Sequence, residues 1–283
     1  GGDGPFLHTA QIIVDFLIHL TDHPRLRLFL IGLTQCGLIF VLVLLFVHAS
    51  DRLLKFSRNM FNKKRLTWKA ASKRYARDSF KHRYLNSEFE ERLGTISEST
   101  MDRISKASGM ELREMMAEEG GMSCVTVMMV FVSRAKSAGR ELGALTEEMY
   151  DQALKTAMTL DKIPRSGQVN GVKSPWLDKR RWPLLGVPVC FSDALDLKGF
   201  DSTCGLIEQC FSVSDKDAMV VKVMRDSGAV PFVKTNMQNL LNGTTNLIWG
   251  PCRDPWKMGR DQLHGEGPLV ALGLAPIGLG LGP

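Results

Sequence analysis

Three side chains of this sequence are of the types from which a serine hydrolase builds a catalytic triad. Ser192 could supply a nucleophile, His264 a base and Asp193 an orienting carboxylate. Ser192 and Asp193 are neighbours, but His264 lies far along the chain, and no pattern of the sequence brings the three together. These residues alone therefore do not predict a working triad.

Two further sets of residues could bind a metal or a phosphate. The six cysteines include no Cys-x-x-Cys pair, and no His falls at metal-ligand spacing from them. The Gly-Leu repeat at residues 278–282 has no following Gly-Lys-Ser/Thr, so it is a weak signal for a phosphate loop. We expect no metal and no cofactor, and we expect the cysteines to be buried or inert thiols. They are Cys36, Cys124, Cys190, Cys204, Cys210 and Cys252.

A long apolar run precedes all of these residues. Residues 28–48 contain no Asp, Glu, Lys or Arg, and about 20 apolar residues in a helix cross the ~30 Å hydrocarbon core of a bilayer. The run is longer than the apolar core of a signal peptide, which is ~7–15 residues. We therefore expect an N-terminal tail at 1–27 and a transmembrane helix at 28–48, with a signal peptide or a buried soluble helix as the alternatives.

The segment after this run is strongly basic. Between Asp51 and Arg83 there are twelve Lys and Arg against two Asp, a local charge of +10, whereas the whole chain carries +6. Because the more basic flank of a span stays inside, we expect a single-pass protein with its main body in the cytoplasm. Because the basic segment adjoins the predicted transmembrane helix, we expect its charges to attract membrane lipid and not nucleic acid.

Residues 49–100 are accordingly predicted to form a basic juxtamembrane helical segment. Apolar or aromatic residues recur in it at every seventh position, which gives one slanted stripe on a helix. These residues are Leu54, Phe61, Trp68, Tyr75, His82 and Phe89. The candidates for contact with a lipid surface are Lys63, Lys64, Arg65, Lys69 and Trp68. A solvated helix that packs its stripe on the rest of the protein is the alternative.

The remaining chain changes from helical to mixed patterns. Spacings of three and four predict one amphipathic helix from Ser99 to Glu118, a helix capped by Ser123, and another that opens at Thr146. Further on, an apolar run at 186–191, a helix between Ser214 and Gly228, and a run at 229–236 predict a strand, helix and strand. Such a unit implies a largely parallel sheet covered by helices.

Three segments in this order resemble the amidase signature family, and within it the fatty-acid amide hydrolase branch. They are GVPVCFSDALDLKGFDSTCGL, SDKDAMVVKVMRDSGAVPFVKTN and NLIWGPCRDPWK. The likeness is clear from Leu185 to Lys257 and weaker from Ile104 to Leu160. It implies an α/β fold in which residues 101–283 form part of an amidase-signature domain with a mixed sheet. It also implies a membrane-anchored protein that hydrolyses lipid amides, with a fatty-acid amide-like small molecule as ligand.

The same resemblance implies a Ser–cis-Ser–Lys triad, which this chain does not carry intact. The position of the family's Lys is occupied by Ser192, and the position of the middle Ser by Gln262. The nucleophile is expected beyond the C-terminus. Lys198 follows too late to replace the missing base, and its pairing with Gly199 matches a turn of the family.

Three interpretations of function remain open. The first is that the chain, whose two ends look cut, is the first part of a membrane amidase. The second is a pseudoenzyme or lipid-binding membrane adaptor, and the third is an unrelated membrane protein or a basic interaction module. Whether it is an enzyme, its oligomeric state and its organelle are left undecided by the sequence.

Overall fold

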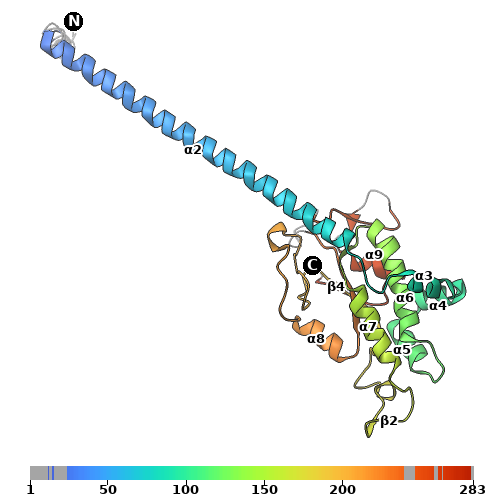
Figure 1. The fold of residues 1–283 in the computed structure, drawn as a ribbon. Coiled ribbons are helices and arrows are strands. Elements are labelled where there is room, and N and C mark those ends of the chain that lie inside the picture. The colour runs from blue at the N-terminus through green and yellow to red at the C-terminus, as the bar shows by residue number, and fades with distance from the viewer. Residues whose placement is uncertain are drawn as a thin grey trace, which may run out of the picture. The chain divides into compact units, whose positions relative to one another are not determined.

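The computed structural model describes residues 12, 15, 24–238, 246–257, 261–262 and 264–281 (Figure 1). The chain divides into two compact units, Gly1–Lys64 and Arg65–Pro283. Its α-helices are α2 (Pro24–Ser79), α3 (Ser87–Gly94), α4 (Glu98–Lys106), α5 (Gly109–Ala117), α6 (Cys124–Arg134), α7 (Tyr150–Asp161), α8 (Met219–Asp226) and α9 (Glu266–Ala271). Its strands are β1 (Leu145–Glu148), β2 (Gln168–Val169), β3 (Val172–Lys173), β4 (Pro188–Ser192), β5 (Val230–Thr235), β6 (Cys252–Arg253), β7 (Asp261–Gln262) and β8 (Gly278–Leu279).

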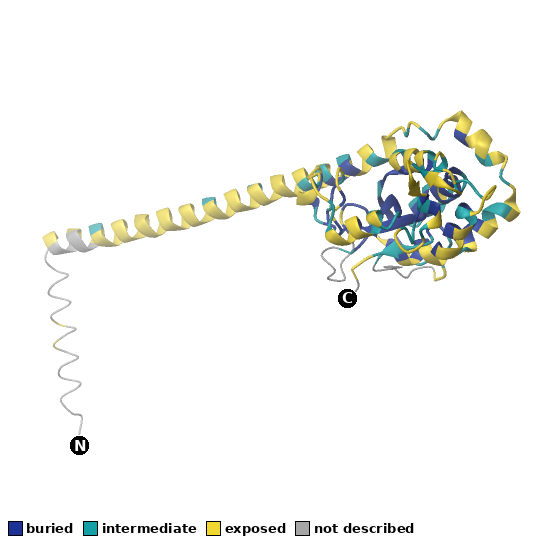
Figure 2. Ribbon diagram, turned by 90° about the horizontal axis from the view of Figure 1, so that it is seen from below, coloured by how far each residue is buried: buried dark blue, intermediate teal, exposed yellow. Residues whose placement is uncertain are grey.

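The described part of the first unit is, apart from Ile12 and Asp15, the N-terminal part of α2. Among the described residues, one helix is long and apolar enough to cross a membrane, and it is α2. No residue of its most apolar 18-residue stretch is buried. Figure 2 colours most of this stretch as exposed. A helix that is apolar all round and packs against nothing in water is unfavourable, because its side chains remain hydrated. Its length and composition suit a bilayer.

The second unit is built on a four-stranded mixed sheet in the order β1-β5-β4-β8. β4 pairs in parallel with β5 and with β8, and β1 pairs antiparallel with β5. The predicted strand–helix–strand unit is confirmed as β4, α8 and β5, and so is the mixed α/β fold. Gly228 ends α8 with φ 92°, a conformation that favours glycine.

The core of this unit surrounds α6, whose residues are apolar on nearly every face. All residues from Cys124 to Val132 except Thr126 are buried, because α7 packs on α6 on one side and other helices and the sheet cover the rest. The predicted cap is confirmed: the Ser123 hydroxyl accepts a hydrogen bond from the Thr126 backbone at 3.0 Å. Asp161 at the end of α7 accepts the backbone N–H of Cys124 at 2.8 Å, so the helix N-terminus is satisfied by a carboxylate.

Two helix predictions were wrong. The expected helix from Ser99 to Glu118 is broken into α4 and α5, because Ser108 and Glu111 form a capping box that starts a new helix. The helix expected to open at Thr146 is preceded by strand β1, in which Leu145 pairs with Thr235 of β5. Tertiary pairing with β5 therefore overrides the helical spacing of this short segment.

Two further details differ from expectation. Ser214 does not cap α8, whose N-cap is Ala218; its hydroxyl donates to Asp196 at 2.9 Å instead. The seventh-residue stripe extends only to Tyr75, because α2 ends at Ser79. His82 lies beyond that end and contacts Glu148 at 3.2 Å.

Candidate active site

Ser192 ends β4 and is fully buried. Its neighbour across the sheet is Thr235 of β5. The Ser192 hydroxyl lies 3.8 Å from the sulfur of Met237 and 3.5 Å from the backbone N–H of Ala194. Within the described residues no ammonium or guanidinium contacts this hydroxyl, so the position carries a small neutral group packed against a thioether.

Glu266 of α9 lies on the same side of the sheet as Ser192. Its Oε1 accepts the Thr235 hydroxyl at 2.7 Å, whereas its buried Oε2 has no partner among the described residues. Burial raises the pKa of Glu266, although the hydrogen bond from Thr235, nearby His264 and the neighbouring Ser192 hydroxyl oppose this shift. The site therefore holds a carboxyl group that is more easily protonated than usual, and beside it a His264 Nδ1 that is also buried without a partner.

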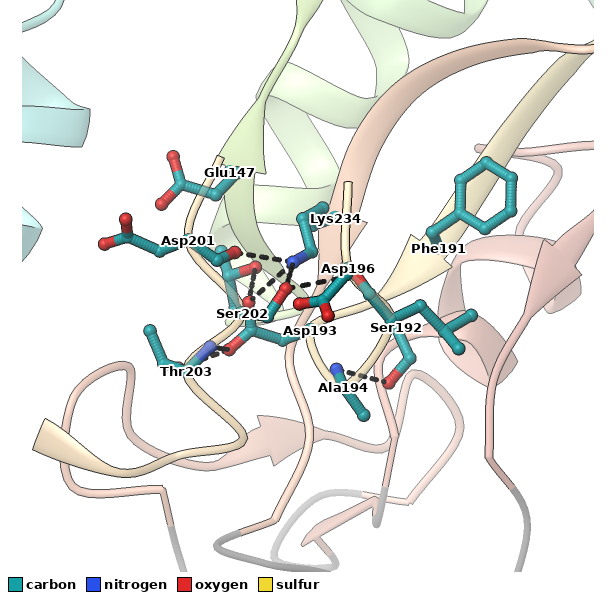
Figure 3. Close-up of polar contacts among 12 residues, drawn as sticks. Glu147, Phe191, Ser192, Asp193, Ala194, Asp196, Asp201, Ser202, Thr203 and Lys234 are labelled. Carbon is teal, nitrogen blue, oxygen red and sulfur yellow. Dashed lines mark hydrogen bonds and ion pairs between the residues drawn. The ribbon is translucent and has the colours of Figure 1, made fainter. Parts of the chain in front are cut away.

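The other side of the sheet holds a buried ion cluster, shown in Figure 3. Asp193 is fully buried and accepts the backbone N–H of Thr203 at 3.1 Å as well as the Thr203 hydroxyl. Lys234 of β5 is also fully buried. Its ammonium donates to the Asp201 carbonyl at 2.5 Å and the Ser202 hydroxyl at 2.9 Å, and lies 3.6 Å from the Asp193 carboxylate.

These interactions fix the loop that follows β4. Burial lowers the pKa of Lys234, and the charge of Asp193 opposes the shift. Burial likewise raises the pKa of Asp193, and Lys234 opposes that shift. With three acceptors around the ammonium, the geometry favours the ion pair, so the cluster serves to hold residues 193–203 in place.

α2 extends this cluster through Lys73. The ammonium of Lys73 pairs with Glu147 of β1 and, at 2.8 Å, with Asp201. Burial disfavours the charged form of Lys73, but the two carboxylates outweigh it and raise its pKa. The last turns of α2 thus supply the cation that two buried carboxylates require.

Lys234 does not replace the base that the family places at position 192. Successive residues of a strand point to opposite faces of a sheet. Lys234 reaches Asp193 on one face of the sheet. The hydroxyl of the next residue, Thr235, donates to Glu266 on the other face, which also holds Ser192. In Figure 3 the Ser192 hydroxyl accordingly lies apart from the ammonium.

The structure does not assemble the other candidate residues into a triad. Asp193 is bound to Thr203 and Lys234, and His264 is not among its partners in the described residues. Lys198 is exposed on a turn with Gly199 at φ 90°, which agrees with a structural role. Gln262 lies in β7 opposite Cys252, but its side chain is outside the described residues. Among the described residues no group of three His, Cys, Asp or Glu could hold a metal ion.

The sequence reasoning missed Lys234, Lys73 and Glu266. The available signal for Lys234 was a charged residue inside an otherwise apolar strand, since such a residue is buried only when paired. Of the lipid-surface candidates, Lys63 and Lys64 lie in the first unit, and Arg65, Trp68 and Lys69 in the second.

Comparisons with known proteins place this site in a family. Residues 126–281 match the family model described as Amidase. Amidase 1 of Gibberella moniliformis is 33% identical over 185 residues, which cover 63% of this chain and 33% of the relative. Fatty-acid amide hydrolase 2 of Homo sapiens is 25% identical over 178 residues, covering 61% of this chain and 32% of the relative.

Among solved structures, a fatty acid amide hydrolase superposes with a TM-score of 0.55 at 21% identity, covering 68% of this chain and 32% of the other, which shows a shared fold. The chain spans about a third of the length of the curated relatives it matches.

Proposed function

Since the chain belongs to the amidase family, we propose that it is a membrane-anchored relative of the lipid amide hydrolases whose site lacks the family's lysine base. In this proposal residues 1–283 recognise long-chain amides but do not hydrolyse them by the Ser–cis-Ser–Lys route. The main body lies on the cytoplasmic side, as the excess of positive charge after residue 50 favours.

The observation that carries the proposal is Ser192. A general base must accept a proton near neutral pH, and a buried lysine does so because burial lowers its pKa. A serine hydroxyl has no such equilibrium in this range. The Ser192 side chain is also enclosed, with the Met237 sulfur at 3.8 Å, so a second basic group does not reach it in the described structure.

The ordered framework around Ser192 supports the binding part of the proposal. The loop after β4 is held by a buried cluster around Asp193 and Lys234. Asn236, at the end of β5, donates to the carbonyls of Gly143 and Gly250 at 2.8 Å and 3.1 Å. These contacts hold the carboxyl ends of the strands, where the family's substrate site is expected.

The test is hydrolysis of a long-chain fatty-acid amide by the full chain in neutral detergent, alongside Ser192→Lys. We expect no turnover by the natural sequence, with saturable binding of the amide. Turnover that a serine-directed fluorophosphonate abolishes would show a nucleophile and base that the proposal denies. Ser202→Ala, which removes the hydroxyl beside Lys234, then identifies whether that pair is responsible.

A further inference from the structure

A groove in the Arg65–Pro283 unit lies between the last turns of α2 and the segment around the 3₁₀ turn η3 (Ile207–Gln209). Its volume is about 610 Å³, within the ~300–1,000 Å³ typical of small-molecule sites. The lining residues are Arg65, Leu66, Trp68, Lys69, Ser72, Glu208 and Phe211.

The groove carries a cation that the described protein leaves unpaired. Arg65 and Lys69 are one helical turn apart and therefore lie on the same side of α2. The Lys69 ammonium donates to the Glu208 carbonyl at 2.7 Å, which ties the helix to the opposite wall. Arg65 has no hydrogen bond or ion pair with any described residue. The Glu208 carboxylate reduces the positive charge of the groove, but the Arg65 guanidinium has no partner in the described part of the chain, and a guanidinium suits a phosphate.

Two aromatic rings stand exposed in the same groove. Trp68 is 70% exposed and Phe211 is 52% exposed. Phe211 has φ 61°, a left-handed conformation that is unfavourable for a bulky side chain. The Phe211 N–H donates to Asp201, and the Lys73 ammonium lies 5.5 Å from the centre of its ring. The fold thus holds an apolar ring toward solvent in a strained conformation, which points to a role in binding.

We propose that this groove binds the phosphate of an anionic phospholipid, with Arg65 and Lys69 on the phosphate oxygens and Trp68 and Phe211 against the glycerol and first acyl carbons. Tryptophan and basic side chains are the groups enriched at the headgroup level of bilayers. The proposal rests on the membrane association proposed above and adds to it a lipid class and a site. An acidic peptide matches the charge of the groove but not its exposed apolar rings beside a bilayer-spanning helix.

The stretch of α2 between the apolar run and the groove also has a composition that suits a membrane surface. Residues 49–64 separate it from the apolar run, about 24 Å of helix at 1.5 Å per residue. A stretch of this length can lie along a membrane surface and bring its side chains to the level of the headgroups. Leu54, Phe56 and Phe61 are exposed among the basic residues there, and an amphipathic surface helix has that composition.

The experiment measures binding to the full chain in neutral maltoside detergent by titration calorimetry. The probes are dihexanoyl phosphatidic acid, dihexanoyl phosphatidylcholine and inorganic phosphate. The variants are Arg65→Gln, Phe211→Gly and, as a matched control, Arg180→Gln, which removes an exposed arginine that does not line the groove. Phe211→Gly removes the ring and also relieves the positive φ, so loss of binding by this variant does not arise from a strained fold.

We expect saturable binding of phosphatidic acid, weakened about tenfold or more by Arg65→Gln because a charge-assisted hydrogen bond is lost. Phe211→Gly also weakens binding, with no lower Tm, and Arg180→Gln binds like the natural sequence. Equal affinity for phosphatidylcholine, equal affinity for inorganic phosphate, or an equal loss in Arg180→Gln overturns the proposal. The hydrolysis assay on the same preparation reports separately on Ser192, so failure of one proposal is distinct from failure of the other.

Discussion

Replacing Lys234 with Met tests the ion cluster that holds the loop after β4. The substitution keeps an unbranched side chain of similar length and removes only the ammonium. Lys234 and Asp193 are both fully buried, 3.6 Å apart between Nζ and Oδ1. The variant therefore leaves the Asp193 carboxylate in the interior without its cation.

The expected loss is about 3–5 kcal/mol in the free energy of unfolding, the usual effect of removing one partner of a buried pair. Two charge-assisted hydrogen bonds, to the Asp201 carbonyl and the Ser202 hydroxyl, are lost with the ammonium. Thr203 still donates to Asp193 through its backbone and its hydroxyl, which places the loss toward the lower end of the range. A loss of 3 kcal/mol changes the unfolding equilibrium more than about 100-fold.

The assay is denaturant unfolding of the full chain in neutral detergent, followed by the fluorescence of its tryptophans, among them the buried Trp176. Lys198→Met is the matched control, because Lys198 is exposed on the same loop and its loss should change stability by less than about 0.5 kcal/mol. The double variant with Asp193→Asn removes the stranded charge and should recover part of the loss. A loss below about 1 kcal/mol for Lys234→Met would refute the reasoning that the ion pair stabilises this loop.

Three further outcomes are expected. Gly278→Ala should destabilise the sheet by about 1–3 kcal/mol in the same assay, because the new Cβ would lie 2.9 Å from the Cβ of Glu266. Gly267→Ala meets nothing within 4 Å and should be near neutral; equal losses would contradict this. Because burial raises the folded-state pKa of Glu266 above its ordinary value of 4.5, the folded chain holds this proton longer than the unfolded chain. Its contribution to stability therefore falls as pH rises above 4.5. Glu266→Gln should flatten the pH dependence of the unfolding free energy above pH 4.5, whereas parallel curves for the two proteins would argue against this reasoning. Protease added outside intact cells should spare residues after Ser50, and cleavage there without permeabilisation would reverse the proposed orientation.

The β4–α8–β5 unit was predictable because its signals are local. Two apolar runs flank a helical segment, and Gly228 supplies the stop that a helix C-terminus favours. β1 was missed because residues 145–148 form a short segment in which three of the four residues are polar, and only their pairing with β5 makes them a strand. Pairing between residues so far apart in the chain is not encoded in local spacing.

At the candidate site, too, local sequence features were predictable and contacts between distant segments were not. The replacement at position 192 was visible from the motif, because it concerns the identity of one residue in a recognisable run. The partners of that residue were not visible. Met237 and Glu266 reach Ser192 from other segments, and only the folded chain shows that Lys234 faces the opposite side.

Lys73 has a practical consequence for producing this protein in soluble form. Removing the apolar run is the obvious route, and the end of α2 at Ser79 is a tempting place to start the shortened polypeptide. That cut would delete the cation paired with Glu147 and Asp201, whose side chains are 15% and 2% exposed. Two like charges would then face each other in the interior, and misfolded, aggregating material is the expected yield. A start at or before Arg65 keeps the last turns of α2, which belong to the globular Arg65–Pro283 unit although they continue the apolar helix.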